Sequence, residues 1–291
     1  RIARDIPDMA ILAMRCASSA ATAMPTALPR GYGCDRRCPA RAPSSATIFC
    51  SKGCRTRRRR WNTSCWLAIC RRLVSPLAGF VHGVLNTDNI NITGESFDYG
   101  PWRFTEFWDP RFTAAYFDET GLYAFGRQAE TMHWNLGQLA VSLRLICEAP
   151  PLIEALERFP GLFQAAIVRR FLWRLGLQSQ GTERDRELVE AAERAMVRGK
   201  IPIDTFFHSY RGGRTPDGAE PDEDRRAFET VLADYRASGT LTHPYWLSEK
   251  PCSMLIVEVE HIWSAIAQAD DWAPLMQKVE AIASMRAALS E

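Results

Sequence analysis

The segment that decides the fold is His82–Pro101, which reads HGVLNTDNINITGESFDYGP. Within it, Ile90 and Ile92 alternate with polar residues, and a turn-forming glycine, Gly94, follows them. Alternation of this kind around a glycine predicts two short β-strands joined by a tight turn. We therefore expect a small polar hairpin between positions 89 and 98.

Two registers of this hairpin are open. With Thr93-Gly94 as the two-residue loop, Asn89 and Asp98 face each other. With Gly94-Glu95 as the loop, Asp98 faces Asn91 instead, and Asn89 stays close. Either register brings an Asn amide oxygen and an Asp carboxylate near one point.

Such a pair of oxygen ligands suits Mg²⁺, which completes its shell with water and substrate phosphates. The neighbouring Asp88 is placed to take a proton from an incoming hydroxyl. Together these are the parts of a phosphoryl or nucleotidyl transfer site. A polar hairpin with Asx-turns and no metal fits the same spacing, so the spacing alone leaves both interpretations open.

A resemblance to known proteins narrows the choice. The pair His82-Gly83, then Asn89, a hairpin and Asp98-Tyr99-Gly100 resemble the catalytic and metal-binding loops of the protein kinase-like fold. Kinases and aminoglycoside-type phosphotransferases carry the catalytic Asp directly after the first pair, where this chain has Val84. The whole string HGVLNTDN…G…DYGP resembles the selenoprotein O family, pseudokinase-like enzymes that transfer AMP from ATP to protein hydroxyls.

The resemblance assigns a role to each site residue. Asp88 matches the proposed catalytic base, and Asn89 and Asp98 match the Mg²⁺ ligands, with Asp98 also at the nucleotide. It implies ATP as substrate, Mg²⁺ (or Mn²⁺) as the cation, and proteins bearing Ser, Thr or Tyr as partners. Two rivals are a kinase-like phosphotransferase and a catalytically dead fragment that at most binds a partner.

Composition separates the chain into two parts. Residues 1–75 carry 15 basic and 3 acidic residues, whereas residues 76–291 carry 21 basic and 31 acidic ones. Seven of the nine cysteines also precede residue 76. No apolar run reaches the roughly 18 residues needed to cross a bilayer, and the first residues do not read as a secretory signal. We expect a cytoplasmic protein that binds neither nucleic acid nor a membrane.

Residues 1–75 do not read as a folded domain. Their Cys-x3-Cys spacings are weak zinc signals, and the run Arg57–Arg60 has no interleaved aromatic residues that would favour nucleic acid. We interpret most of this segment as out-of-frame translation, since Arg, Ala, Pro, Cys and Ser dominate it. The family carries a nucleotide-binding lobe here, so the chain is expected to be a carboxy-terminal fragment without it.

For the remainder we predict an α+β fold, mainly α, resembling the C-terminal lobe of a kinase with a small catalytic hairpin. Residues 76–150 would form the catalytic core and residues 151–291 a helical continuation of the same domain. The aromatic residues between Trp102 and Asp118 are expected to form local core. Apolar spacing predicts helices over 128–147, 152–158, 162–175, 183–198, 203–210, 222–238, 253–269 and 272–290.

Overall fold

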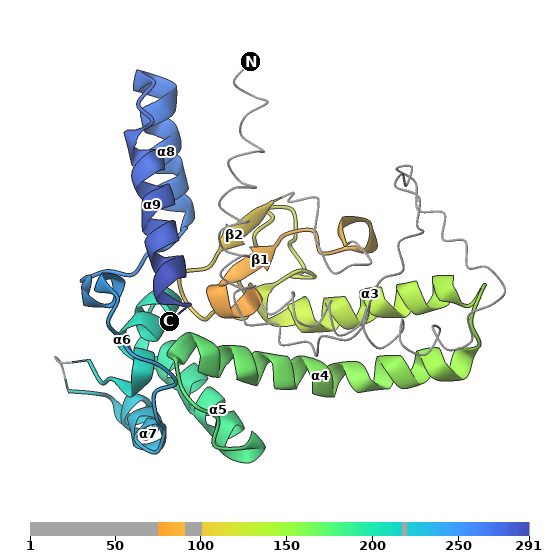
Figure 1. Ribbon diagram of the computed structural model, residues 1–291. Coiled ribbons are helices and arrows are strands. Elements are labelled where there is room, and N and C mark those ends of the chain that lie inside the picture. Colours follow the sequence, from red (N-terminus) through yellow and green to blue (C-terminus); the bar gives the residue numbers. More distant parts are fainter. Residues whose placement is uncertain (1–74, 91–100, 217–219, 291) are drawn as a thin grey trace, which may run out of the picture.

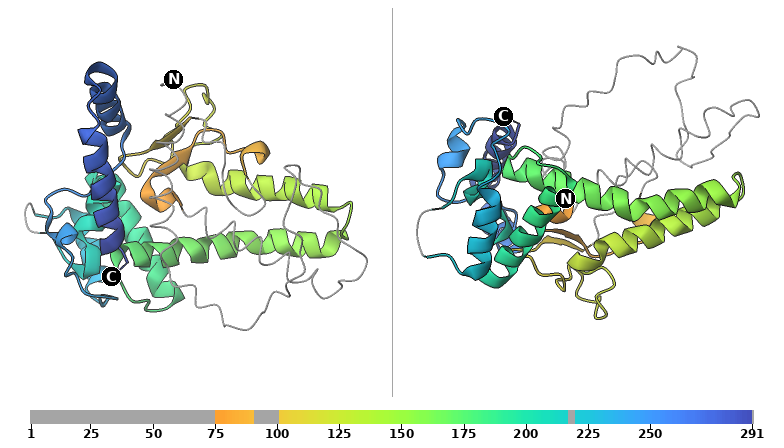
Figure 2. Two further views of the ribbon diagram at one scale, coloured as in Figure 1. Left: turned by 45° about the horizontal axis from the view of Figure 1, so that its top comes forward. Right: turned by 90° about the horizontal axis from the view of Figure 1, so that it is seen from below.

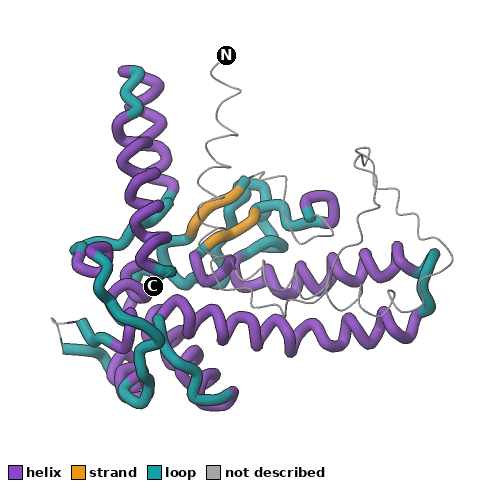
Figure 3. The backbone as a smooth tube through the Cα atoms, in the orientation of Figure 1, coloured by secondary structure: helices purple, strands orange, loops and turns teal. Residues whose placement is uncertain are grey.

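The computed structural model describes residues 75–90, 101–216 and 220–290. Within these ranges the chain is mainly helical with one small antiparallel sheet, as the sequence predicts (Figure 3). Of residues 1–75 only Ser75 is described. The predicted hairpin beyond Ile90, with Asp98, also lies outside the described residues.

The sheet has two short strands, β1 (Phe80–His82) and β2 (Trp102–Phe104). They pair antiparallel with Phe80 opposite Phe104 and His82 opposite Trp102. Aromatic side chains cluster on the pair, where the ring of Phe80 stacks on that of Trp102 with centroids 6.2 Å apart. Cross-strand aromatic contacts of this kind stabilise strands too short to persist alone.

The longest helices, α3 (Gln128–Leu143) and α4 (Ala149–Leu175), lie side by side and antiparallel in both views (Figures 1 and 2). The prediction of two helices over 152–158 and 162–175 is wrong, because α4 runs unbroken through Pro160. Proline removes one backbone donor. Leu152, Phe159 and Ala166 nevertheless share one buried face on both sides of it, and their packing outweighs that loss.

The other helices follow the predicted segments closely. They are α5 (Thr182–Gly199), α6 (Ile203–Ser209), α7 (Glu223–Leu232), α8 (Ile256–Ala269) and α9 (Ala273–Ala288). Short 3₁₀ turns occupy Ser75–Ala78, Thr87–Asn89, Phe125–Arg127, Arg211–Gly213 and Pro244–Leu247. Helix α7 ends before the predicted Ser238, because the chain turns so that Ala237 forms a bridge with Leu177. Helices α8 and α9 form a hairpin that stands away from the rest (Figure 1).

The largest core cluster lies where the end of α4 meets α5, α6 and α7, and it includes Phe171, Phe206 and Phe228. Leu77, just before β1, belongs to the same cluster. Arg174 of α4 donates to the carbonyl of Leu77 and pairs with Asp204 of α6. The residues leading into β1 are therefore fixed to the helical part.

None of the helices that the structure describes combines the length and the apolar composition needed to span a bilayer.

Candidate active site

The sheet brings together the two ends of the segment that carries the candidate site residues. Beyond the paired strands, Gly83 N–H donates to Pro101 O at 2.6 Å, and at the far end Thr105 N–H donates to Gly79 O at 2.8 Å. A Cβ at Gly83 would lie 2.3 Å from Pro101 O and 3.0 Å from Ala115, so only glycine fits. The ladder thus places the residues before Asp88 beside those after position 100.

Three apolar side chains anchor this part of the chain, each in a different cluster. Leu77 packs into the large helical core, Val81 packs with Ala114 and Phe125, and Leu85 packs with residues of α3 and α4. All three are at most 3% exposed. Each burial contributes about 1.5–3 kcal/mol, so the loop starts from a firmly held base.

A buried glutamine secures β1 from the side opposite β2. Gln128, the first residue of α3, accepts a hydrogen bond from His82 N–H at 3.2 Å and donates to Phe80 O at 3.0 Å. It is 7% exposed. Gln128 is not among the predicted site residues, because a single glutamine at the start of a helix has no spacing pattern to reveal it.

The histidine of the His-Gly pair forms a hydrogen bond with the turn that follows β1. His82 is buried, and its Nδ1 accepts the backbone N–H of Val84 at 3.1 Å. An accepting Nδ1 carries no proton, so the neutral ring holds its proton on Nε2. His82 therefore sets the direction in which the chain leaves β1.

Asp88 and Asn89 lie together in the 3₁₀ turn Thr87–Asn89. Asp88 is exposed, whereas Asn89 is 7% exposed. Asn89 Nδ2 donates to Val84 O at 2.8 Å, and its backbone N–H donates to Asn86 O at 3.2 Å. Because Nδ2 is used in this way, the atom that Asn89 can offer a cation is the amide oxygen Oδ1.

This arrangement suits Mg²⁺ chemistry. Within the described residues, the buried side chain of Asn89 is held by a part-buried hydrogen bond to Val84 O, next to the exposed carboxylate of Asp88. Val84 stands where kinases carry the catalytic Asp, and its half-buried side chain cannot accept a proton. Among the described residues 83–90 the one acidic side chain is Asp88, so it is the candidate base. The third predicted residue, Asp98, is not described, and its pairing with Asn89 stays a prediction.

Helix α3 also secures the loop at a second point. Asn135 Nδ2 donates to Leu85 O and to Thr131 O, both at 2.9 Å. Asn135 is 5% exposed, so it fills a buried, hydrogen-bonded position. Gln128 and Asn135 lie about two helical turns apart on one face of α3.

The aromatic segment after β2 is only partly core. Trp108 and Phe112 pack against the cluster of Val81, Ala114 and Phe125, in agreement with the prediction. Tyr116 and Phe117 do not, because they are 92% and 52% exposed. The prediction of local core is therefore wrong for this pair.

Comparisons with known proteins bear on this geometry. A family model described as protein adenylyltransferase SelO matches residues 76–283. The chain is 34% identical over 228 residues to the protein nucleotidyltransferase YdiU of Synechocystis sp., covering 70% of this chain and 48% of that protein. It is 35% identical over 213 residues to the protein of the same name from Gloeobacter violaceus, covering 67% and 44%. The Pseudomonas putida protein nucleotidyltransferase YdiU is 37% identical over 163 residues, covering 55% and 33%. The chain thus spans about half the length, or less, of these relatives.

Proposed function

Because this chain belongs to the SelO family of protein adenylyltransferases, we propose that it transfers AMP from ATP to Ser, Thr or Tyr hydroxyls of proteins, with Mg²⁺. The observation that carries the proposal is the position of Asp88 and Asn89 in one turn of a loop whose two ends are joined at Gly83 and Pro101. The exposed carboxylate of Asp88 supports its role as the base.

In the proposed reaction, the oxygen of the acceptor hydroxyl bonds to the α-phosphorus of ATP while Asp88 accepts the proton of that hydroxyl. The bond from the α-phosphorus to the bridging oxygen breaks, and pyrophosphate leaves. Asn89 Oδ1 and the carboxylate of Asp98 would hold Mg²⁺, which neutralises charge on the phosphates. The hydrogen bonds that the buried side chains of Asn89 and His82 make to Val84 keep the loop in place, so little reorganisation accompanies the transfer.

The proposal extends to the fold. Residues 76–291 would be the helical lobe of a protein kinase-like domain, with residues 76–150 as its catalytic part and residues 151–291 as its helical continuation. A cytoplasmic location belongs to the same proposal. Among the described cysteines, Cys147 and Cys252 are free thiols, as expected in a reducing compartment.

The test uses ATP labelled at either the α- or the γ-phosphate, with a mixture of proteins as acceptors. Label transferred from the α-position supports AMP transfer. Label transferred only from the γ-position would show that the chain is a phosphotransferase and would overturn the proposal. The Asp88→Asn variant should reduce transfer by about 10²–10⁴-fold, whereas Asp234→Asn, at an exposed site after α7, should not.

Calorimetry with Mg·ATP separates an impaired enzyme from a dead fragment. We expect binding that Asp98→Ala abolishes and Asp88→Asn leaves unchanged, because Asp98 is a proposed metal ligand and Asp88 is not. Absence of Mg·ATP binding together with absence of transfer from either label would favour the fragment that at most binds a partner.

A further inference from the structure

A hollow of about 780 Å³ lies between β2 and the segment that follows it, residues 110–127. Its floor is made of small residues, including Ala114, Ala115 and Ala124. Ala115 also lies against Gly83, where a Cβ would come within 3.0 Å of it. The hollow therefore adjoins the turn that leads to Asp88.

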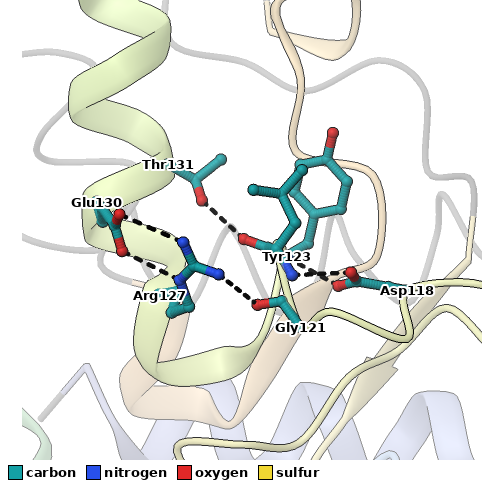
Figure 4. Close-up of polar contacts among 7 residues, drawn as sticks. Asp118, Gly121, Tyr123, Arg127, Glu130 and Thr131 are labelled. Carbon is teal, nitrogen blue, oxygen red and sulfur yellow. Dashed lines mark hydrogen bonds and ion pairs between the residues drawn. The ribbon is translucent and has the colours of Figure 1, made fainter.

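Polar contacts brace one wall of the hollow (Figure 4). The buried carboxylate of Asp118 accepts the backbone N–H groups of Leu122 and Tyr123, both at 2.8 Å. Thr131 Oγ1 donates to Leu122 O at 3.1 Å. Arg127 pairs with Glu130 at 3.1 Å and also donates to the carbonyl of Gly121 at 3.4 Å. The wall is thus formed before any ligand arrives, which lowers the entropic cost of binding.

The charges that remain on the rim favour an anion. The acid Asp118 is turned towards backbone donors, and the base Arg127 is paired with Glu130. Among the described residues, the Arg103 guanidinium on β2 has no hydrogen bond or ion pair. The Arg111 side chain is 94% exposed, and its ion pair with Asp109 is long, at 4.0 Å, and open to solvent, so this pair neutralises its charge only weakly. Apart from Asp118, the one acid among the described residues that line the hollow is Glu119.

The exposed aromatic side chains favour a polypeptide over a small anion. Tyr116 lines the hollow, and its ring meets that of Phe117 edge to face, with centroids 5.2 Å apart. Both rings are largely exposed. Tyrosine and arginine are among the residues enriched where proteins bind one another, so exposed copies beside a hollow favour a docking surface.

We propose that this groove, with Arg103, Arg111 and Tyr116 on its rim, docks an acidic segment of the protein that accepts the AMP group. Acceptor hydroxyls flanked by Asp or Glu are then preferred. The identity of this polypeptide as the substrate rests on the proposed function, whereas the binding itself does not.

The test measures fluorescence anisotropy of two short fluorescein-labelled peptides. Each has a central serine, flanked by Asp and Glu in one peptide and by Asn and Gln in the other. We expect the acidic peptide to bind at least about tenfold more tightly, and the difference to shrink as salt is added. Equal binding of the two peptides would overturn the proposal.

Substitutions then locate the binding. The Arg103→Glu, Arg111→Glu double variant should bind the acidic peptide about tenfold more weakly or worse and should gain affinity for a matched Lys- and Arg-flanked peptide. Tyr116→Ala should weaken both the acidic and the neutral peptide. The control carries the same charge change elsewhere, Arg169→Glu on α4 with Arg194→Glu on α5, two exposed positions that do not line the hollow. An equal loss in the control would overturn the assignment to this groove.

The design separates this inference from the proposed function. Asp98→Ala should remove Mg·ATP binding, because the proposed function makes Asp98 a metal ligand. The peptide assay contains no nucleotide or Mg²⁺, so it measures docking independently of that ligand. Binding of the acidic peptide without AMP transfer would support the docking site and count against the transfer reaction. AMP transfer at equal rates to serines with acidic and with neutral neighbours would support the transfer reaction and count against the docking site.

Discussion

The side-chain amide of Asn135 donates a hydrogen bond of 2.9 Å to the backbone carbonyl of Leu85, fifty residues earlier in the chain. The same nitrogen donates to Thr131 O within α3. Both donors of this amide are therefore used, and the residue is buried. The loop that carries Asp88 and Asn89 is joined to helix α3 through this contact.

Asn135→Ala should loosen that loop. The change leaves the buried carbonyl of Leu85 without this donor, which costs about 1–3 kcal/mol of unfolding free energy. Urea unfolding measures the loss, and hydrogen exchange should become faster at the amides of Leu85 to Asn89 in particular. Gln138→Ala is the matched control, because Gln138 is an exposed amide on the same helix. Equal unfolding free energies for the two variants would show that the contact contributes nothing.

Gln128→Glu should weaken the hold on β1. The substitution keeps an acceptor for His82 N–H but replaces the donor to Phe80 O with an oxygen, so two acceptors meet at the buried site. We expect a loss of about 1–3 kcal/mol, measured by urea unfolding. The same substitution at the exposed Gln164 of α4 should have almost no effect. A loss no larger at Gln128 than at Gln164 would contradict the role we assign to it.

Much of the helical fold could be predicted from the sequence, because long amphipathic segments carry their own signal. Helix α5 is the clearest case, since it matches the predicted range 183–198 closely and its exposed face carries paired charges, as in Arg184–Glu187 and Arg186–Glu183. Its buried face includes Leu188 and Ala192. Helix α4 was misread at Pro160, because tertiary packing outweighed a local helix-breaking signal.

The sheet and its supports were harder to foresee. Strands β1 and β2 have three residues each, which is too short for an alternating pattern to be recognised, and a long segment separates them in the chain. The place of Asp88 beside Asn89 follows from sequence alone. The contacts that hold them, from Gln128 and Asn135, depend on where α3 packs, which single side chains cannot reveal.

Gly83→Ala should disrupt the junction at the base of the loop. The new Cβ would lie 2.3 Å from the carbonyl oxygen of Pro101, so either the strands separate or the loop shifts. We expect a loss of several kcal/mol, on the order of the larger single-mutation effects, measured as a lower midpoint of urea unfolding. Mg·ATP binding should weaken in parallel, because the two ends of the site segment meet here.

Gly137→Ala provides the opposite control for this prediction. Gly137 lies within α3, and a Cβ there would meet nothing within 4 Å. Replacing a helical glycine with alanine typically stabilises by about 0.5–1 kcal/mol. Gly83→Ala must therefore destabilise while Gly137→Ala stabilises. If both variants shift the midpoint in the same direction, the steric argument at Gly83 fails.

Cys252 should be an unreactive thiol in the folded chain. Burial raises its pKa to about 11 from an ordinary value of 9.0, although the nearby Lys278 opposes this effect. Alkylating reagents attack the thiolate. At pH 9, iodoacetamide should therefore modify Cys252 about 50-fold more slowly in the folded chain than in urea, as followed by mass spectrometry of the peptide that contains it. Equal rates in the two states would show that the thiol is not shielded.

The same pKa shift fixes the sign of a pH effect on stability. Between about pH 9 and pH 11 the unfolded chain loses the thiol proton while the folded chain keeps it, so the contribution of Cys252 is complete below pH 9 and is lost as the pH rises to 11. Tyr245, whose pKa burial raises to about 12, adds a similar loss at higher pH. The useful quantity is therefore the difference in unfolding free energy between the wild type and Cys252→Ala. That difference should stay constant up to about pH 9 and then shrink, and a difference that grows with pH would contradict the shift.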